Sequence, residues 1–343
     1  MEGFVKISKY AGMREDLVQA GGGNSSFKIS DDKMAVKASG FQLADITIND
    51  GYALVNQKII MELFLNASDF SNITENVSKT ILEESFIEGK KPSIETFLHA
   101  ISGRYTLHTH PIVVNVLACR KGGMNVLREL FPKALIVPYA TPGVELAKAY
   151  FNSYKESAGD NNVIFDIVFL QNHGLVVSAD TADEVIEKTE FVIKKIEEYL
   201  DVDFSSYHEL TMIWNYFPGK IVWKVTDENI ISVFSEIGVW RHGFCPDCVV
   251  FLGKSFLDLP NEFDEKGIEK FRELYGEPVI VTYKGTLYIL ADSVNKALET
   301  QSIMSFSAQV MDINRGYECN MLSDEEHSYL LNWDAEKYRK TMR

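Results

Sequence analysis

The 343-residue chain has only four cysteines and nine prolines, and it lacks any long apolar run. Four scattered cysteines are too few for a disulfide scaffold, and the first residues lack the apolar core of a secretory signal. We therefore expect a cytoplasmic protein. No stretch approaches the roughly 20 apolar residues that a membrane-spanning helix needs, so no membrane partner is expected.

Basic residues are also scarce. Lys and Arg total 34 against 49 Asp and Glu, which leaves a net charge of −15. Such a surface repels polyphosphate chains, so nucleic acid is not an expected partner. The hydrophobic share of 46% is ordinary for a globular protein and excludes disordered and collagen-like classes.

The pattern of apolar residues predicts two α/β units with mostly antiparallel sheets. Short apolar runs separated by Gly and Asp turns predict strands within residues 20–56, over 104–116 and on both sides of 171–174. Helices are predicted over 92–102, where Pro suits the first turn, and over 181–200, where a capping box begins the segment.

The pattern becomes irregular after about residue 205, so the predicted domains are residues 1–205 and 206–343. In the second domain, strands are predicted over 220–225, 248–253 and 278–291, the last as a hairpin around Lys284-Gly285. Helices are predicted over 292–311 and from 323 onward. No motif assigns this domain a role.

Cys245 and Cys248 form a C-x-x-C motif. A zinc ribbon needs a second such pair, and the chain has none. A thioredoxin-type motif precedes a helix, whereas the following residues 249–253 resemble a strand. The two cysteines are therefore interpreted as incidental small residues at a strand start.

Three histidines are candidate metal ligands. His108 and His110 lie two apart on a predicted strand, so their side chains project from the same face. His173 follows an apolar strand in the tight turn Gln-Asn-His-Gly. Three imidazoles with an open position suit a catalytic Zn²⁺. The alternatives are hydrogen-bonded core residues for the pair and a turn residue for His173.

Glu95 lies in the first turn of the helix predicted directly before the histidine strand. Its carboxylate either complements the helix dipole or reaches whatever the metal binds. His99, one helical turn later, is interpreted as structural.

Two polar turns are candidate anion sites. Residues 21–26, with the sequence GGGNSS, offer backbone N–H groups and hydroxyls, and residues 37–40, with the sequence KASG, offer a cation and a hydroxyl. Each could equally be a simple hairpin turn. Neither is a G-x-G-x-x-G or Walker loop, which disfavours dinucleotide binding.

In chain order, GGGNSS, KASG, PSIE, HTHP and QNHG, with PYATPG at 138–143, resemble the class II aldolase/adducin family of zinc-dependent sugar-phosphate aldolases. The resemblance covers about residues 5–200. It is greatest to the aldolase half of fused rhamnulose-phosphate aldolase/short-chain dehydrogenase proteins. It implies an α/β fold with three layers, in which helices flank a mostly antiparallel central sheet, plus a smaller C-terminal α/β domain.

The resemblance also implies roles for individual residues. His108, His110 and His173 would bind Zn²⁺ or another divalent cation, and Glu95 would be the catalytic carboxylate. The implied substrate and phosphate ligands are Gly23, Asn24, Ser39, Gly40 and Ser93. Lys37 is added to them because Gly21 and Ile94 stand where simpler aldolases carry hydroxyl residues. No NAD is expected, because the chain ends where the dehydrogenase half would begin.

The implied activity is that of a lyase in carbohydrate metabolism, which cleaves a ketose phosphate by retro-aldol chemistry through a metal-bound enediolate while Glu95 moves the proton. Sugar-phosphate 4-epimerase, decarboxylase and dehydratase activities on the same scaffold stay open, as does a non-catalytic adducin-like association domain. The family often adds a tyrosine from a neighbouring subunit, for which Tyr139 and Tyr317 are candidates. A homo-oligomer is expected, with tetramers among the family's assemblies.

Overall fold

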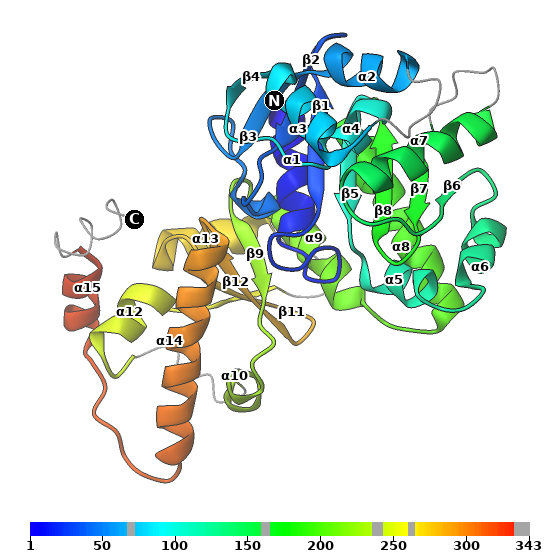
Figure 1. The fold of residues 1–343 in the computed structure, drawn as a ribbon. Coiled ribbons are helices and arrows are strands. Elements are labelled where there is room, and N and C mark those ends of the chain that lie inside the picture. The colour runs from blue at the N-terminus through cyan, green and yellow to red at the C-terminus, as the bar shows by residue number, and fades with distance from the viewer. Residues whose placement is uncertain (67–72, 159–164, 235–242, 260–264, 333–343) are drawn as a thin grey trace. The chain divides into compact units, whose positions relative to one another are not determined.

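The computed structural model describes residues 1–66, 73–158, 165–234, 243–259 and 265–332 (Figure 1). The chain divides into two compact units, Met1–Phe204 and Ser205–Arg343. Within the described ranges, no helix combines the length and apolar character needed to cross a membrane.

The described part of the first unit is built on one eight-stranded sheet, with strand order β4-β3-β2-β1-β5-β8-β7-β6. Every neighbouring pair is antiparallel except β6 and β7. The strands are β1 Asn24–Lys28, β2 Lys33–Lys37, β3 Tyr52–Asn56, β4 Phe86–Gly89, β5 Tyr105–Thr109, β6 Leu135–Val137, β7 Ile167–Leu170 and β8 Gly174–Ala179.

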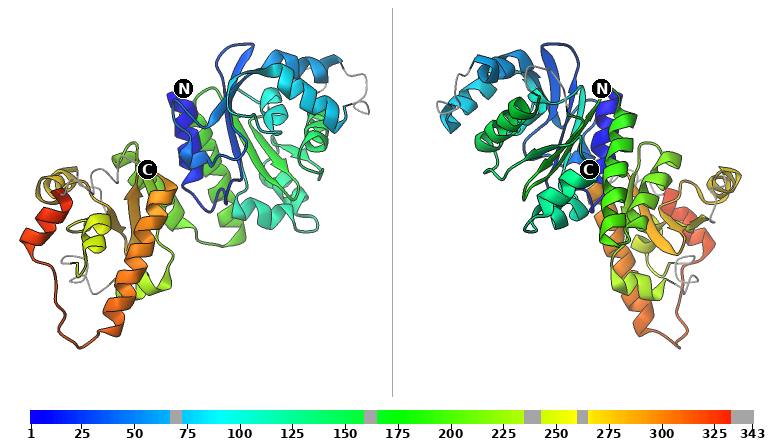
Figure 2. Two further views of the ribbon diagram at one scale, coloured as in Figure 1. Left: turned by 60° about the vertical axis from the view of Figure 1, so that its left-hand side comes forward. Right: turned by 90° about the vertical axis from the view of Figure 1, so that its right-hand side faces the viewer.

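Helices cover both faces of this sheet, as the two views of Figure 2 show. On one face α1 and α8 pack against each other and against the central strands, with α5 beside α8 and α6 beside α5. On the other face lie α2, α3, α4 and α7. The helices are α1 Glu2–Gly12, α2 Gln57–Asn66, α3 Glu75–Ser85, α4 Thr96–Ile101, α5 Ile112–Ala118, α6 Gly123–Leu130, α7 Val144–Ala158 and α8 Ala182–Leu200, with a short 3₁₀ turn at Leu43–Asp45. The predicted three-layer α/β fold is confirmed.

Aromatic residues fill the layer beneath α4 and α7. Phe64, Phe97 and Phe151 meet with ring centroids 5.9 and 5.0 Å apart, and all three are buried. Burying a side chain of this size contributes about 1.5–3 kcal/mol relative to exposure. This packing anchors α4, the short helix that Glu95 precedes.

The predicted helix boundaries were correct for α8 and wrong for α4. At α8, Thr181 and Glu184 form the expected capping box. The helix predicted from Pro92 starts only at Thr96. Pro92 instead forms a β-bridge with Ala38, and the carbonyl of Lys91 accepts a 2.9 Å hydrogen bond from the Ser39 amide, so this stretch is held in extended form.

The described part of the second unit has a four-stranded sheet of order β10-β11-β12-β9, in which only β10 and β11 run parallel. The predicted hairpin is confirmed, with Lys284 and Gly285 at φ of 49° and 80° in its turn. The described elements of the second unit are α9 Ser205–Tyr216, β9 Ile221–Lys224, α10 Glu228–Val233, α12 Pro246–Leu252, β10 Leu257–Leu259, α13 Glu265–Tyr275, β11 Ile280–Tyr283, β12 Thr286–Ala291, α14 Val294–Ile313 and α15 Asp324–Asn332.

The strand predicted over 248–253 was wrong, because these residues belong mostly to α12. A short apolar run fits a buried strand and a buried helix equally well. Here Pro246 occupies the first turn, and Cys248, Val249 and Leu252 are buried against the neighbouring helices. The predicted final helix begins at Asp324, and its last residues, from 333 onward, lie outside the described part of the chain.

Candidate metal centre

The candidate site residues gather at one edge of the first unit's sheet. Because β2, β1, β5 and β8 are successive antiparallel neighbours, the start of β1, the ends of β2 and β5 and the start of β8 all lie at this edge. In the register, Asn24 of β1 and Val176 of β8 flank His108 of β5.

His108 is fully buried, and both its ring nitrogens have neighbours. Nδ1 lies 3.0 Å from the carbonyl oxygen of Leu175, to which it donates a hydrogen bond. This bond fixes the tautomer and leaves a lone pair on Nε2. That Nε2 lies 3.1 Å from Nε2 of His173 and 3.2 Å from Nε2 of His110.

His110 follows the last residue of β5, and its backbone is held by the loop before β1. Its N–H donates a 2.8 Å hydrogen bond to the carbonyl of Leu17, and the Ile112 N–H donates one of 2.9 Å to the carbonyl of Asp16. Gly22 of the same loop lies against the ring, since a Cβ there would sit 2.9 Å from Nδ1 of His110.

His173 lies in the turn between β7 and β8, as the sequence indicates. Asn172 before it takes the left-handed conformation with φ of 54°. A side chain on Gly174 after it would meet the carbonyl oxygen of Thr109 at 2.2 Å. Nδ2 of Asn115 in α5 donates a 3.2 Å hydrogen bond to the His173 carbonyl. Nothing in the sequence pattern distinguishes Asn115, so sequence analysis missed it.

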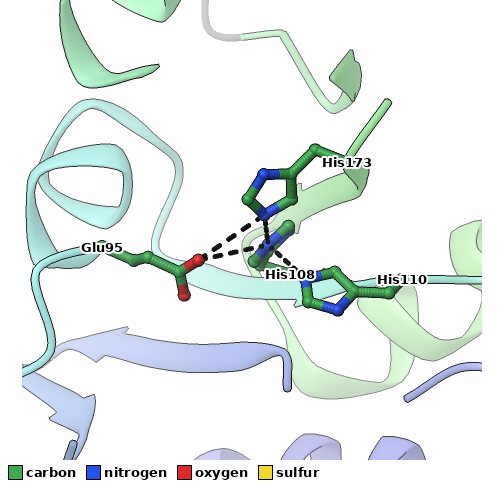
Figure 3. Close-up of side chains that lie close together, drawn as sticks. All are labelled: Glu95, His108, His110 and His173. Carbon is green, nitrogen blue, oxygen red and sulfur yellow. Dashed lines mark hydrogen bonds and ion pairs between the residues drawn. The ribbon is translucent and has the colours of Figure 1, made fainter. Parts of the chain in front are cut away.

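Glu95 completes the cluster from the opposite side, immediately before α4, and Figure 3 shows its carboxylate turned toward the imidazoles. Its Oε1 lies 3.6 Å from Nε2 of His108 and 3.6 Å from Nε2 of His173. Its Oε2 accepts a 3.3 Å hydrogen bond from Nδ2 of Asn24. The extended stretch 91–93 delays the start of α4, which leaves Glu95 at the helix entrance and not inside its first turn.

Burial and mutual charge set the protonation of the cluster. Burial lowers the pKa of His108, and it lowers that of His110 to about 3, with the other two imidazoles acting in the same direction. Burial acts to raise the pKa of Glu95, but the imidazoles of His108, His173 and His99 outweigh it and hold that pKa below its usual range. Burial therefore favours the neutral imidazoles of His108 and His110, while the neighbouring rings favour the ionised carboxylate of Glu95.

This donor set fits a divalent metal ion. Two nitrogens bound tetrahedrally to one Zn²⁺ at about 2.0 Å lie roughly 3.3 Å apart, close to the separations of 3.1 and 3.2 Å here. Ligand atoms from Glu95 and the three histidines all lie within 4.8 Å of one another. Metal binding requires deprotonated imidazoles, which is the state that burial favours.

The candidate anion ligands are less closely gathered. Lys37, at the end of β2, is buried, and burial lowers its pKa, although Glu95 opposes this. Its Nζ donates a 3.4 Å hydrogen bond to the carbonyl of Gly21, so the ammonium faces the glycine loop. Gly23 in this loop has φ of 70°, which suits glycine.

The second polar turn lies beside the segment that carries Ser93. Ser39 and Gly40 are exposed, and the bond from the Ser39 amide to Lys91 joins the two segments. The Ser93 hydroxyl accepts a 3.3 Å hydrogen bond from the Glu95 amide. Within the described ranges, the Ser39 hydroxyl makes no bond to the imidazole cluster.

His99 and the two candidate tyrosines lie outside the cluster. His99 is buried, its Nδ1 is 2.8 Å from the Ser26 hydroxyl, and burial lowers its pKa to about 3, in keeping with a structural role. The Tyr139 side chain is 59% exposed, while its amide donates to Oε1 of Gln171 in the His173 turn. Tyr317 belongs to the second unit and is 77% exposed.

Comparisons with known proteins agree with this geometry. The family described as Class II Aldolase and Adducin N-terminal domain matches residues 2–200. The "Uncharacterized oxidoreductase YuxG" of Bacillus subtilis (strain 168) is 26% identical over 230 residues, which are 64% of this chain and 31% of that protein. The match thus spans about a third of that relative's length.

Among solved structures, the N-terminal class II aldolase domain of a conserved protein from Thermoplasma acidophilum has 24% identity and a TM-score of 0.50, and the match covers 58% of this chain and 92% of that chain. This likeness shows the fold. Because the family model matches more than half of this chain, the chain belongs to the class II aldolase and adducin N-terminal domain family.

Proposed function

We propose that the first unit is a metal-dependent aldolase, a carbon–carbon lyase that cleaves a ketose phosphate by retro-aldol chemistry, and that its ion is Zn²⁺. One observation carries the proposal. The Glu95 carboxylate lies 3.6 Å from Nε2 of both His108 and His173, which places a proton carrier directly beside the three converging imidazoles.

Each residue of the centre has a part in this proposal. His108, His110 and His173 would hold the ion, which supplies Lewis acidity toward the carbonyl and hydroxyl oxygens of the sugar. In condensation the Glu95 carboxylate removes a proton from the carbon beside the carbonyl, and in cleavage the acid form returns it. Asn24 restrains Oε2 and leaves Oε1 facing the imidazoles.

The phosphate would lie at the glycine loop. It would accept hydrogen bonds from the backbone N–H groups of Gly23 and Asn24 and from the ammonium of Lys37, which faces the same loop through the carbonyl of Gly21. Ser93, Ser39 and Gly40 would complete the pocket from the neighbouring segments. Lys37 is the one buried cation in this group, so it would contribute most to anion binding.

The three imidazoles and the Glu95 carboxylate together argue against a purely associative, adducin-like role. A domain used only for association has no need for three buried or half-buried imidazoles around a carboxylate. Epimerase, decarboxylase or dehydratase chemistry would use the same centre, and product analysis separates these reactions from retro-aldol cleavage.

The test is a panel of ketose 1-phosphates assayed for aldehyde release by the full chain with added Zn²⁺, Mn²⁺ or Co²⁺. Glu95→Gln keeps the size of the side chain but removes its basicity, so turnover should fall by about 10²–10⁴-fold while metal content stays unchanged. Glu88→Gln, a change at an exposed carboxylate of β4, is the matched control. Aldehyde release at the wild-type rate by Glu95→Gln would contradict the proposed role.

We propose that residues 206–343 form a separate domain of unassigned role, and that the chain forms homo-oligomers. Light scattering on the purified chain tests the second point, and limited proteolysis followed by mass analysis of the fragments tests the first.

A further inference from the structure

Two thiols of the second unit lie close enough to react with each other. Sγ of Cys245 is 3.2 Å from Sγ of Cys248. Cys245 is the N-cap of α12, and Cys248 occupies the third helical position. The strand expected after this motif is therefore a helix, and the reason for treating the cysteines as incidental no longer holds.

The side chains at this helix start bring the two sulfurs close to bonding distance. Side chains at the N-cap and third helical position approach each other, as they do in a capping box. Residues three apart on a helix have Cβ atoms about 5–6 Å apart, against about 3.5–4.5 Å in a disulfide, so the first turn has to tighten when the bond forms. Closing the bond shortens the sulfur separation of 3.2 Å by about 1.1 Å, which side-chain rotation and a small adjustment of the first turn can supply.

The two thiols differ in access. Cys245 is half-buried, so a small reagent reaches it from solvent. Cys248 is only 3% exposed and lies among the residues packed between α12 and α14. Burial, followed by the proximity of Cys245, raises the pKa of the Cys248 thiol to about 12. An external reagent therefore meets Cys245 first.

We propose that Cys245 and Cys248 form a redox-active dithiol whose reaction partner is a low-molecular-weight disulfide. The Cys245 thiolate attacks one sulfur of the partner, which forms a mixed disulfide and releases one thiol. The Cys248 thiolate, after losing its proton to solvent, attacks Sγ of Cys245 and releases the second thiol. One partner disulfide is reduced to two thiols while the protein dithiol is oxidised to a disulfide, so atoms and electrons balance.

A metal site is the competing use of two adjacent cysteines. Within the described ranges, the one group of three or more potential metal ligands is the Glu95 cluster of the first unit, so no third ligand accompanies the two sulfurs there. A C-x-x-C pair without further ligands favours disulfide exchange over tight metal binding.

The test equilibrates the full chain with mixtures of reduced and oxidised glutathione, followed by acid quenching, maleimide labelling and mass analysis of the intact chain and its peptides. As the mixture becomes oxidising, maleimide labels should fall from four per chain to two, with the bond mapped between Cys245 and Cys248. Adding reduced glutathione should restore four labels.

The other two cysteines provide the matched controls. The double variant Cys119→Ser/Cys319→Ser should still lose two labels, because neither residue takes part. Cys248→Ser should accumulate a glutathione adduct at Cys245, because the resolving thiol is gone, whereas Cys245→Ser should show neither that adduct nor the internal bond.

Several outcomes would overturn the proposal. Four labels at every glutathione ratio would show that the pair is inert. Bonds formed only between chains, or a stable adduct at Cys245 of the wild type, would show that Cys248 does not resolve. Zinc that protects both thiols from labelling and is lost in Cys245→Ser would identify a metal site.

Discussion

Arg14 donates two hydrogen bonds to the carboxylate of Asp16, from Nε to Oδ1 at 2.8 Å and from Nη2 to Oδ2 at 2.6 Å. Its Nη1 also pairs with Glu190 of α8, and the whole side chain is buried. The carbonyls of Asp16 and Leu17 in turn accept the backbone N–H groups of Ile112 and His110. Arg14 is thus a positioning residue for the loop that holds one imidazole of the candidate metal centre.

Replacing Arg14 by Met should both destabilise the fold and weaken metal binding. The change removes the guanidinium from the buried carboxylate of Asp16 and from Glu190, which keeps the hydrogen bond from the Tyr10 hydroxyl. Loss of this ion pair should cost about 3–5 kcal/mol of unfolding free energy. Urea unfolding measures this loss, and competition with a chromogenic chelator measures metal affinity. Arg14→Lys should recover part of both, because it restores the charge without the bidentate geometry.

Lys6→Met is the control for Arg14. Lys6 of α1 pairs with Asp183 of α8, but both partners are exposed, with side-chain exposures of 42% and 71%. Its loss should cost no more than about 1 kcal/mol and leave metal affinity unchanged. If Arg14→Met binds metal as tightly as the wild type while folded, the loop does not depend on this ion pair.

The glycines before β1 offer a second test of the metal centre. A Cβ on Gly22 would lie 2.9 Å from both the Gln19 carbonyl and Nδ1 of His110, whereas a Cβ on Gly21 would meet nothing within 4 Å. Gly22→Ala should therefore push the His110 ring away and lower metal affinity by about tenfold or more, by analogy with changes to groups that orient metal ligands. Gly21→Ala, one residue earlier, should bind metal normally. Isothermal titration with Zn²⁺ compares the two, and equal affinities would show that the His110 ring tolerates the displacement.

Local patterns predicted the strand and turn that carry the imidazoles, but the strand predicted over 104–116 was too long, because β5 ends at Thr109 and residues from 112 form α5. Alternation over residues 104–110 and the QNHG turn indicated where His108, His110 and His173 lie in the secondary structure, because side-chain direction follows directly from strand period and turn position. Their convergence on Glu95 is a tertiary feature, and the sequence indicated it only through resemblance to a family.

Other features could not be predicted because they depend on residues far apart in the chain. The Arg14–Glu190 pair joins residues 176 positions apart, and neither lies in a recognisable motif. The late start of α4 depends on the bridge between Ala38 and Pro92. The helix after Cys245 replaced a predicted strand because the apolar run that follows suits both, and packing against α14 and α15 decides between them.

Lys37→Met tests whether the substrate carries a phosphate. Removing this buried ammonium should raise KM for a phosphorylated ketose by about tenfold, equivalent to roughly 1.4 kcal/mol of binding, with little effect on an unphosphorylated analogue. Lys33→Met, at the other end of β2 and more exposed, is the control and should change neither KM. If Lys37→Met raises KM equally for the phosphorylated and the unphosphorylated substrate, Lys37 does not bind the phosphate.

Lys28 should make stability depend on pH in the alkaline range. Its Nζ donates hydrogen bonds of 2.8 and 2.5 Å to the carbonyls of Ala100 and Ser102, and burial lowers its pKa from 10.5 to about 8. Below pH 8 the amine is charged in both the folded and unfolded states. Between pH 8 and 10.5 the unfolded chain binds more protons than the folded one, so the unfolding free energy rises with pH, by at most about 1.4 kcal/mol per unit.

Urea unfolding at pH 7, 8, 9 and 10 of the wild type and of Lys28→Met isolates this contribution, because the other titrating groups are common to both chains. The unfolding free energy of the wild type should rise relative to that of Lys28→Met from pH 8 to pH 10. Below pH 8 the difference between the two should stay constant. Lys58→Met, at an exposed lysine of α2, should remain parallel to the wild type throughout. If Lys28→Met also stays parallel up to pH 10, the amine of Lys28 titrates alike in both states, and its burial does not penalise the charged form.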